Sequence, residues 1–289
     1  MAVTYNPVRK AYADTPYGQI HYRYATPAPD QESKGTTIVM LHKSASSSAS
    51  YEALMTQLVK AGHSCYALDM PGFGGSFDPC PAVIQEISEK GTAWYVETFV
   101  SAFTSIGIMG DEAMNKLHLV GHHSGASLAP EIAAKYPSTV LSVTLIGTAV
   151  MSADERAMMK QKYFAPFNKP VEDGSHLIKT WDYLRTMGVG DNLDLYQRQA
   201  IDHIRAWKGR NQIYGAVWDQ DVATYLDMLR CPVMFICARD DVLWEYQVKA
   251  EKRWTQAKYV ECKGANFSPD LDVKGLVKAW TEFTFESKP

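Results

Sequence analysis

Short runs of consecutive apolar residues recur along the chain and alternate with segments whose apolar residues repeat at helical spacing. Two of the runs, Ile38–Leu41 and Val233–Ile236, are apolar without interruption, which is typical of strands covered on both faces. The strands predicted from these runs are Gln19–Tyr24, Thr37–His42, Ser64–Asp69, Leu117–Gly121, Val140–Ile146, Val233–Ala238 and Tyr259–Cys262. The helices predicted beside them are Tyr51–Lys60, Thr92–Ile106, Ser124–Lys135, Glu245–Thr255 and Val273–Phe283. This alternation predicts parallel βαβ units and an α/β fold with a doubly wound, mostly parallel sheet.

One long stretch of the chain contains no predicted strand. Between residues 152 and 229 the apolar positions keep helical spacing, and aromatic residues mark the joints. The helical pieces predicted there are Ser152–Lys162, Ser175–Met187, Leu193–Trp207 and Asp221–Leu229. An insertion of helices between two core strands predicts a cap over one edge of the sheet. We therefore divide the chain into a first core part (1–150), a helical cap (151–229) and a second core part (230–289).

Length and composition fit one large domain with such a cap: the chain has 289 residues, of which 46% are hydrophobic and 21% charged. The formal net charge of -3 supplies no basic face for nucleic acid or an anionic membrane, so neither is an expected partner. No apolar run reaches the roughly 18 residues that span a bilayer. Residues 1–14 lack the apolar core and cleavage site of a signal peptide.

The five cysteines are scattered and carry no metal-ligand spacing, so we expect no metal site. Cys65, Cys237 and Cys262 fall inside predicted strands, where a buried, inert thiol is the ordinary role. An odd number of scattered thiols fits a reducing compartment, and we expect the protein to be cytoplasmic.

Three segments together carry a family resemblance. Ala67–Ser76 contains D-x-P-G-x-G-x-S, Leu117–Ala126 contains a strand ending in G-x-H-x-G before a helix, and Cys237–Asp241 ends a late strand in two acids. In this order, and around a helical insertion, they resemble the α/β-hydrolase superfamily, from about Tyr17 to the end of the chain. The branch with a compact helical cap, which includes epoxide hydrolases, dehalogenases and C–C bond hydrolases, is the most similar. The resemblance implies the fold predicted above, with Asp241 as the acid of the site.

The first departure from the family lies at the nucleophile elbow, the sharp turn that lifts the central side chain clear of the sheet. Such a turn needs small residues two positions before and two after its centre, here Gly121 and Gly125. By this register the centre is His123; a turn centred on Ser124 would place a histidine where only a small residue fits. The backbone N–H of Ser124 is the expected donor to an anionic oxygen. His122 is expected to be structural.

The second departure is in the turn that usually carries the catalytic histidine of the family. Here the turn reads Lys263–Phe267, with Asn266 in the histidine position, and no histidine follows His203. Asparagine cannot accept a proton at neutral pH, which excludes Ser-His-Asp acyl transfer as usually drawn. Asn266 is left either to orient His123 by a hydrogen bond or to be a relic.

The third departure follows the first core strand, where relatives carry His-Gly-x and this chain has His42-Lys43-Ser44. The resemblance implies that the N–H of Ser44 joins the oxyanion hole and that His42 braces this loop. Lys43 is left either as a solvated loop lysine or as a charge at the pocket mouth. We also expect substrate contacts from three residues outside the motifs: His176, Trp181 and Trp244.

Three functions remain open. The favoured one is a cofactor-free enzyme acting on a small, largely apolar molecule, with His123 as general acid or base, Asn266 and Asp241 supporting it, and Lys43 adding charge. Its reaction would be hydrolysis of an ester, lactone or activated C–C bond, or related proton-transfer chemistry. The alternatives are a covalent hydrolase using Ser124 or His123, and a non-catalytic ligand-binding protein on the same scaffold. The expected partner is a small-molecule substrate, and a homodimer is left open.

Overall fold

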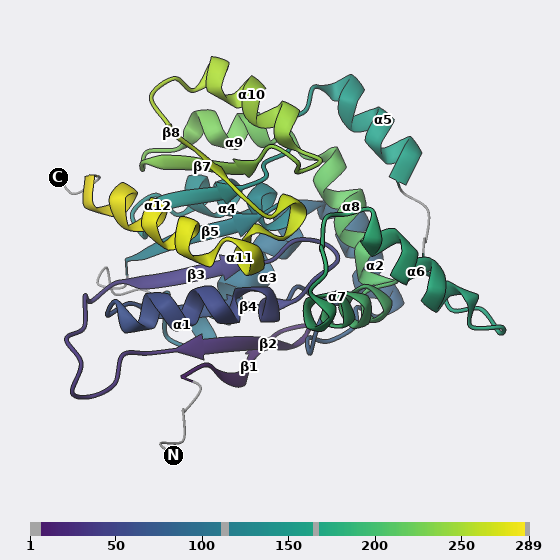
Figure 1. The fold of residues 1–289 in the computed structure, drawn as a ribbon, viewed down its shortest axis with the longest axis horizontal. Helices are drawn as coiled ribbons and strands as arrows, with labels where there is room; N and C mark the ends of the chain where they lie inside the picture. The colour runs from purple at the N-terminus through teal and green to yellow at the C-terminus, as the bar shows by residue number, and fades with distance from the viewer. Residues whose placement is uncertain (1–6, 111–115, 164–167, 287–289) are drawn as a thin grey trace.

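An eight-stranded sheet forms the centre of the molecule (Figure 1). The computed structural model describes residues 7–110, 116–163 and 168–286, so the first six residues of the segment inspected for a signal peptide lie outside the described residues. The strands are β1 (Arg9–Thr15), β2 (Gly18–Ala25), β3 (Thr37–Leu41), β4 (Ser64–Leu68), β5 (Leu117–His122), β6 (Val140–Ile146), β7 (Val233–Ala238) and β8 (Lys258–Cys262). Their order in the sheet is β1-β2-β4-β3-β5-β6-β7-β8.

The pairing of these strands confirms the predicted fold class. β1 pairs with β2, and β2 with β4, in antiparallel fashion, and every other neighbouring pair is parallel. All seven predicted strands are present. The sequence pattern missed β1, because this edge strand leaves most of its residues partly or fully exposed and so shows no apolar run.

The register of the central strands decides where the functional loops meet. Leu41 at the end of β3 lies opposite Gly121 of β5, and Gly121 lies opposite Leu145 of β6. Ile146 of β6 in turn lies opposite Ile236 of β7. The loops that follow β3, β5 and β7 therefore leave the same edge of the sheet side by side, at the carboxyl ends where α/β folds place their ligands.

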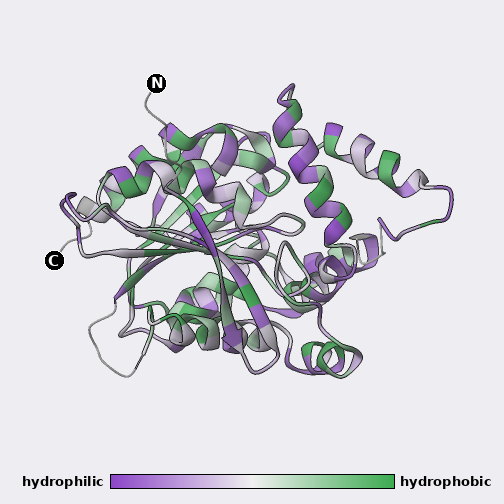
Figure 2. Ribbon diagram, turned by 90° about the horizontal axis from the view of Figure 1, so that it is seen from below, coloured by the Kyte–Doolittle hydropathy of each residue, from purple (hydrophilic) through white to green (hydrophobic). Residues whose placement is uncertain are grey.

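Helices cover both faces of the sheet, and each layer has its own apolar core (Figure 2). The helices outside the insertion are α1 (Glu52–Lys60), α2 (Pro81–Lys90), α3 (Thr92–Ser105), α4 (Ser124–Lys135), α10 (Trp244–Arg253), α11 (Ser268–Leu271) and α12 (Val273–Glu286). α1 and α12 pack on one face, and α3, α4 and α10 contribute to the core on the other. None of the helices in the described ranges is both long enough and apolar enough to cross a bilayer.

The insertion between β6 and β7 consists of helices throughout its described part. They are α5 (Ala153–Tyr163), α6 (Ser175–Arg185), α7 (Leu193–Arg205), α8 (Gly209–Asp219) and α9 (Val222–Met228). The pattern missed α8, whose glycines and polar residues weaken its periodicity. α8 and α9 contribute Ile213 and Leu226 to the main core cluster, whereas α6 and α7 form a separate small core with Phe267. The insertion is thus built into the main core through α8 and α9, whereas α6 and α7 pack around a second, smaller core.

One arginine at the end of α7 ties the insertion to the loop after β4. The Arg205 guanidinium donates to the carbonyl oxygens of Gly74 at 3.1 Å, Gly72 at 3.3 Å and Ser76 at 3.0 Å. It also donates to a carboxylate oxygen of Asp78 at 2.8 Å. Its planar set of donors thereby satisfies three backbone acceptors that no single lysine could reach.

Replacing this arginine should loosen the attachment of α7. Arg205→Ala leaves three carbonyl groups without their donor, and we expect it to lower the free energy of unfolding by roughly 1–3 kcal/mol. Urea denaturation measures the change. Arg185→Ala, at an exposed arginine of α6, is the control and should stay within about 0.5 kcal/mol of wild type. Equal stability of the two variants would contradict this role of Arg205.

Candidate active site

The turn between β5 and α4 has the geometry of a nucleophile elbow with a histidine at its centre. His123 has φ 46° and ψ -106°, a backbone conformation that costs a non-glycine residue about 1–3 kcal/mol. A Cβ on Gly121 would lie 2.3 Å from the carbonyl oxygen of Gly125, and a Cβ on Gly125 would lie 2.0 Å from that of Leu41. Both glycines are therefore required for close packing, and Ser124 begins α4 directly after the turn.

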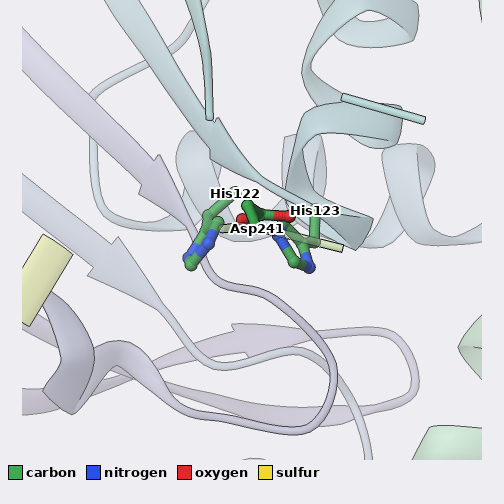
Figure 3. A group of neighbouring side chains, drawn as sticks. All are labelled: His122, His123 and Asp241. Atoms are coloured by element: carbon green, nitrogen blue, oxygen red, sulfur yellow. Dashed lines mark hydrogen bonds and ion pairs between the residues drawn. The ribbon is translucent and has the colours of Figure 1, made fainter. Parts of the chain in front are cut away.

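The imidazole of His123 is paired with the carboxylate of Asp241 from the turn after β7 (Figure 3). The His123 Nε2 and the Asp241 Oδ2 are 2.8 Å apart, and the other carboxylate oxygen accepts the N–H of Leu243 at 2.8 Å. An ionised carboxylate only accepts hydrogen bonds, so the proton of this pair lies on Nε2. In the neutral ring Nδ1 is then the nitrogen that can take up a proton.

Gly147, after β6, makes room for this pair. A Cβ there would lie 2.5 Å from the His123 ring and 3.3 Å from the Asp241 carboxylate, and the φ of +59° disfavours other residues as well. The backbone N–H of His123 also donates to the carbonyl of Ile146 at 2.9 Å. The backbone of His123 is thus held by β6, and its ring is held by Asp241.

Asn266 is not hydrogen-bonded to His123 in the described structure. Its amide nitrogen donates to the carbonyl of Met187 at 2.9 Å, and its oxygen accepts the N–H of Val242 at 3.5 Å. The expectation that Asn266 sets the orientation of His123 therefore needs correction: the carboxylate of Asp241 already occupies Nε2. The amide instead connects the turn after β8 to the loop after α6.

Lys43 is buried rather than solvated, which corrects one of the two interpretations of this residue. It is only 5% exposed, and its Nζ lies 3.6 Å from the centroid of the Phe267 ring. The insertion covers its loop, since the Tyr214 hydroxyl donates to the carbonyl of Ser44 at 3.3 Å. Burial lowers the pKa of Lys43 to about 7, although the nearby carboxylate of Asp241 acts in the opposite direction.

His42 braces the loop that carries Lys43. Its Nε2 accepts the N–H of Met70 at 2.9 Å, so Nδ1 holds the proton and donates to the carbonyl of Lys43 at 2.8 Å. Burial lowers the pKa of His42, which favours this neutral form. His42 is fully buried and is not among the residues that line the cavity at His123.

His122, His123 and Asp241 form the metal-capable group found among the described residues, with ligand atoms within 4.8 Å of one another. A cation would have to replace the hydrogen bond between His123 and Asp241. Burial, His123 and Lys43 all lower the pKa of His122, and the charge of Lys43 that favours its neutral form also opposes a metal ion. The hydrogen-bonded pair therefore accounts for His123 and Asp241, whereas neither ring nitrogen of the buried His122 has a hydrogen-bond partner among the described residues.

A cavity of about 290 Å³ lies over His123. Lys43, His123, His203 and Arg210 are its basic residues, and no aspartate or glutamate lines it among the described residues. Two further lining residues, Ser44 and Asn266, are polar, and the others are mostly apolar or aromatic: Met159, Tyr183, Leu184, Met187, Tyr214, Trp218, Val242, Leu243, Tyr246 and Phe267. A smaller cavity of about 100 Å³ shares Ser44 and His123 and reaches Ser124. The space suits a small, largely apolar molecule with an electron-rich group.

Three residues expected to contact substrate lie elsewhere. Trp181 packs on Tyr196 within the small core of α6 and α7, at 4.1 Å between ring centroids. Trp244 packs under the guanidinium of Arg239. His176 is partly exposed and accepts the N–H of Val171 at 3.3 Å. None of the three lines the cavity at His123.

Two cavity residues had no signal in the sequence. His203 and Arg210 belong to the insertion, where no motif fixes the register of a side chain. Burial lowers the pKa of His203 to about 3, and the charges of Lys43 and Arg210 act in the same direction. His203 is therefore neutral at physiological pH and donates from Nδ1 to the carbonyl of Gln199 at 2.8 Å.

Comparison with known proteins shows which family the sequence matches. A family model described as alpha/beta hydrolase fold matches residues 36–267. No curated protein matches the sequence.

Solved structures share the fold at low sequence identity. A bacterial membrane phospholipase A, a virulence factor, has a TM-score of 0.75 at 16% identity, covering 98% of this chain and 87% of that one. The enol-lactonase from Burkholderia xenovorans LB400 has 0.72 at 15%, covering 95% and 100%. A laboratory-evolved variant of potato epoxide hydrolase has 0.73 at 15%, covering 96% and 99%.

The buried lysine gives a pH-dependent test. An unfolded lysine has a pKa near 10.4, roughly three units above that of folded Lys43. The folded state therefore loses stability as the pH falls from about 10 to about 7, and the full loss persists below pH 7, where the folded state must bury an ammonium ion. We expect Lys43→Met to raise the free energy of unfolding by about 1–3 kcal/mol at pH 6, with the gain shrinking toward pH 10.

Chemical denaturation at several pH values measures this difference. Lys60→Met, at the exposed end of α1, is the matched control and should show no such trend. A difference between Lys43→Met and wild type that does not change with pH would contradict the buried ammonium.

Proposed function

Because the chain belongs to the alpha/beta hydrolase fold family, we propose that it is a cofactor-free enzyme that uses His123 as its general acid and base in place of a serine nucleophile. The observation that carries this proposal is the hydrogen bond between His123 and Asp241 at the centre of the elbow. The substrate is a small, largely apolar organic molecule with a carbonyl group, in keeping with the lining of the cavity. The reaction is hydrolysis of an ester, lactone or activated C–C bond, or related proton transfer.

The proposed step begins at Nδ1 of His123. This nitrogen takes a proton from a water molecule while the water oxygen attacks the substrate carbonyl carbon. The positive charge that forms on the ring is stabilised by Asp241 at Nε2. When the tetrahedral intermediate collapses, the imidazolium returns the proton to the leaving group. No covalent bond to the protein forms along this route.

The oxygen that becomes negative is assigned to the backbone N–H groups of Ser44 and Ser124. Ser124 begins α4, so its N–H is one of the first-turn donors that have no acceptor within the helix. Ser44 lines the same cavity from the loop after β3. Lys43, beside Ser44, is itself buried, and a buried positive charge stabilises a nearby oxyanion more effectively than a solvated one does.

Hydrolysis is the preferred reaction by analogy. The family and the enol-lactonase and epoxide hydrolase of the same fold make it the first analogy to test. An imidazole held by a carboxylate can also move a substrate proton directly, so elimination, decarboxylation and cyclisation use the same residues.

The role of His123 is tested by its removal. We expect His123→Ala to lower kcat about 10²–10⁴-fold, the usual contribution of general acid-base catalysis, with little loss of stability because the elbow accepts a small side chain. The assay is turnover of a panel of small esters, lactones and vinylogous diketones. His176→Ala, at a histidine of the insertion that does not line the cavity, is the control and should keep full activity. Activity of His123→Ala close to wild type would rule out the proposed mechanism.

A second test rebuilds an ordinary triad. His123→Ser combined with Asn266→His supplies a serine at the elbow, a histidine in the family position and Asp241 between them. We expect slow hydrolysis of nitrophenyl esters and labelling by a serine-directed phosphonate in the double variant only. Neither wild type nor either single variant should be labelled, because none of them pairs an elbow serine with a base. A stoichiometric phosphonate adduct on Ser124 of the wild type would support the covalent alternative instead.

A further inference from the structure

Lys43 is a primary amine held in an apolar cavity without a carboxylate partner. Among the described residues no aspartate or glutamate forms an ion pair with it, and its Nζ lies over the face of Phe267. The charged groups that act on it are Asp241, Asp270, Asp202 and Arg198, and the basic groups that share its cavity are His123, His203 and Arg210. From this placement we propose that Lys43 is a nucleophile that forms an imine with the carbonyl carbon of an aldehyde or ketone bound in the cavity.

Burial provides the physical basis for this reactivity. An ammonium group has no lone pair, so only the neutral amine can attack a carbonyl carbon. A pKa of about 7 leaves about half of the Lys43 amines neutral at pH 7, whereas an exposed lysine is neutral in roughly one molecule in 10³. The mostly apolar lining also disfavours the ammonium form.

The step balances with one proton taken from solvent. The Lys43 nitrogen forms a bond to the carbonyl carbon, and one of the amine protons passes to the carbonyl oxygen to give a carbinolamine. The proton from solvent turns the hydroxyl group into water, which leaves as the C=N bond forms. The product is a protonated imine, and hydrolysis by one water molecule returns the ketone and the free amine.

The protonated imine would extend the chemistry of the site. It withdraws electrons from the neighbouring carbon, so a proton on that carbon becomes acidic and the electron pair of the broken C–H bond moves into an enamine. His123, which lines the same cavity, is the base for that proton. Only this second step rests on the proposed function of His123; formation of the imine does not.

The direct test is reductive trapping on the wild-type protein. The protein is incubated with acetone and cyanoborohydride, which reduces an imine to a stable secondary amine, and the adduct is located by peptide mapping. We expect Lys43 to be labelled at least about tenfold faster than Lys60, the exposed lysine of α1, at pH 7. Labelling of Lys43 should reach half its maximum near pH 7, whereas Lys60 should gain reactivity only at alkaline pH.

Two variants separate this inference from the role of His123. In D₂O, proton exchange of acetone methyl groups, followed by NMR, should be lost in Lys43→Met and in His123→Ala, and kept in Lys60→Met. Trapping at Lys43 should persist in His123→Ala. Labelling of Lys43 no faster than that of Lys60 in the wild type would overturn the inference, whatever the variants do. Trapping with full exchange in His123→Ala would instead count against the base role of His123.

Discussion

The site depends on one constraint: the end of β3 and the turn after β5 approach each other closely, and the backbone of His123 in that turn is strained. Gly125 packs against the carbonyl of Leu41, and Gly121 packs against Gly125, so the chain can leave β5 only through a residue with positive φ. That residue is His123, and its strained backbone persists because the β5 ladder, the bond from its N–H to Ile146 and α4 all hold it. The turn lifts the imidazole out of the sheet and toward β7.

On the proposed mechanism, this geometry allows catalysis without the usual serine nucleophile. In the family arrangement implied by the motifs, an acid after β7 supports a histidine after β8. Here the acid remains at Asp241, but its imidazole partner comes from the elbow itself. The vacated position holds Asn266, which has been drawn into the hydrogen bonds of the loops around it. On the proposed mechanism, the acid-imidazole pair is kept and the serine nucleophile is given up.

The sequence allowed more of the fold than of the site to be predicted. Strands such as β3 and β7 can be recognised from their uninterrupted apolar runs, because both of their faces are buried. The exposed edge strand β1 has no comparable run. The elbow glycines mark the place of His123 in the sequence, because they stand at a fixed spacing on either side of it, although Gly125 packs against Leu41 of a different strand. Burial of Lys43 depends on Phe267, which is distant in sequence and has no motif linking it to the lysine. The same holds for Arg210, whose position follows from the packing of the insertion.

The position of the proton on the neutral His123 ring is the sharpest test of the proposed role of Nδ1 as the base. A long-range ¹H–¹⁵N spectrum of the protein labelled at its 8 histidines, with His123→Ala for assignment, reports which ring nitrogen carries the proton when the ring is neutral. We expect the proton on Nε2, where it is donated to Asp241, and no proton on Nδ1. We also expect Asp241→Asn to shift the Nε2 signal. A neutral His123 with its proton on Nδ1 would rule out the proposed mechanism, because the nitrogen assigned as the base would already carry a proton.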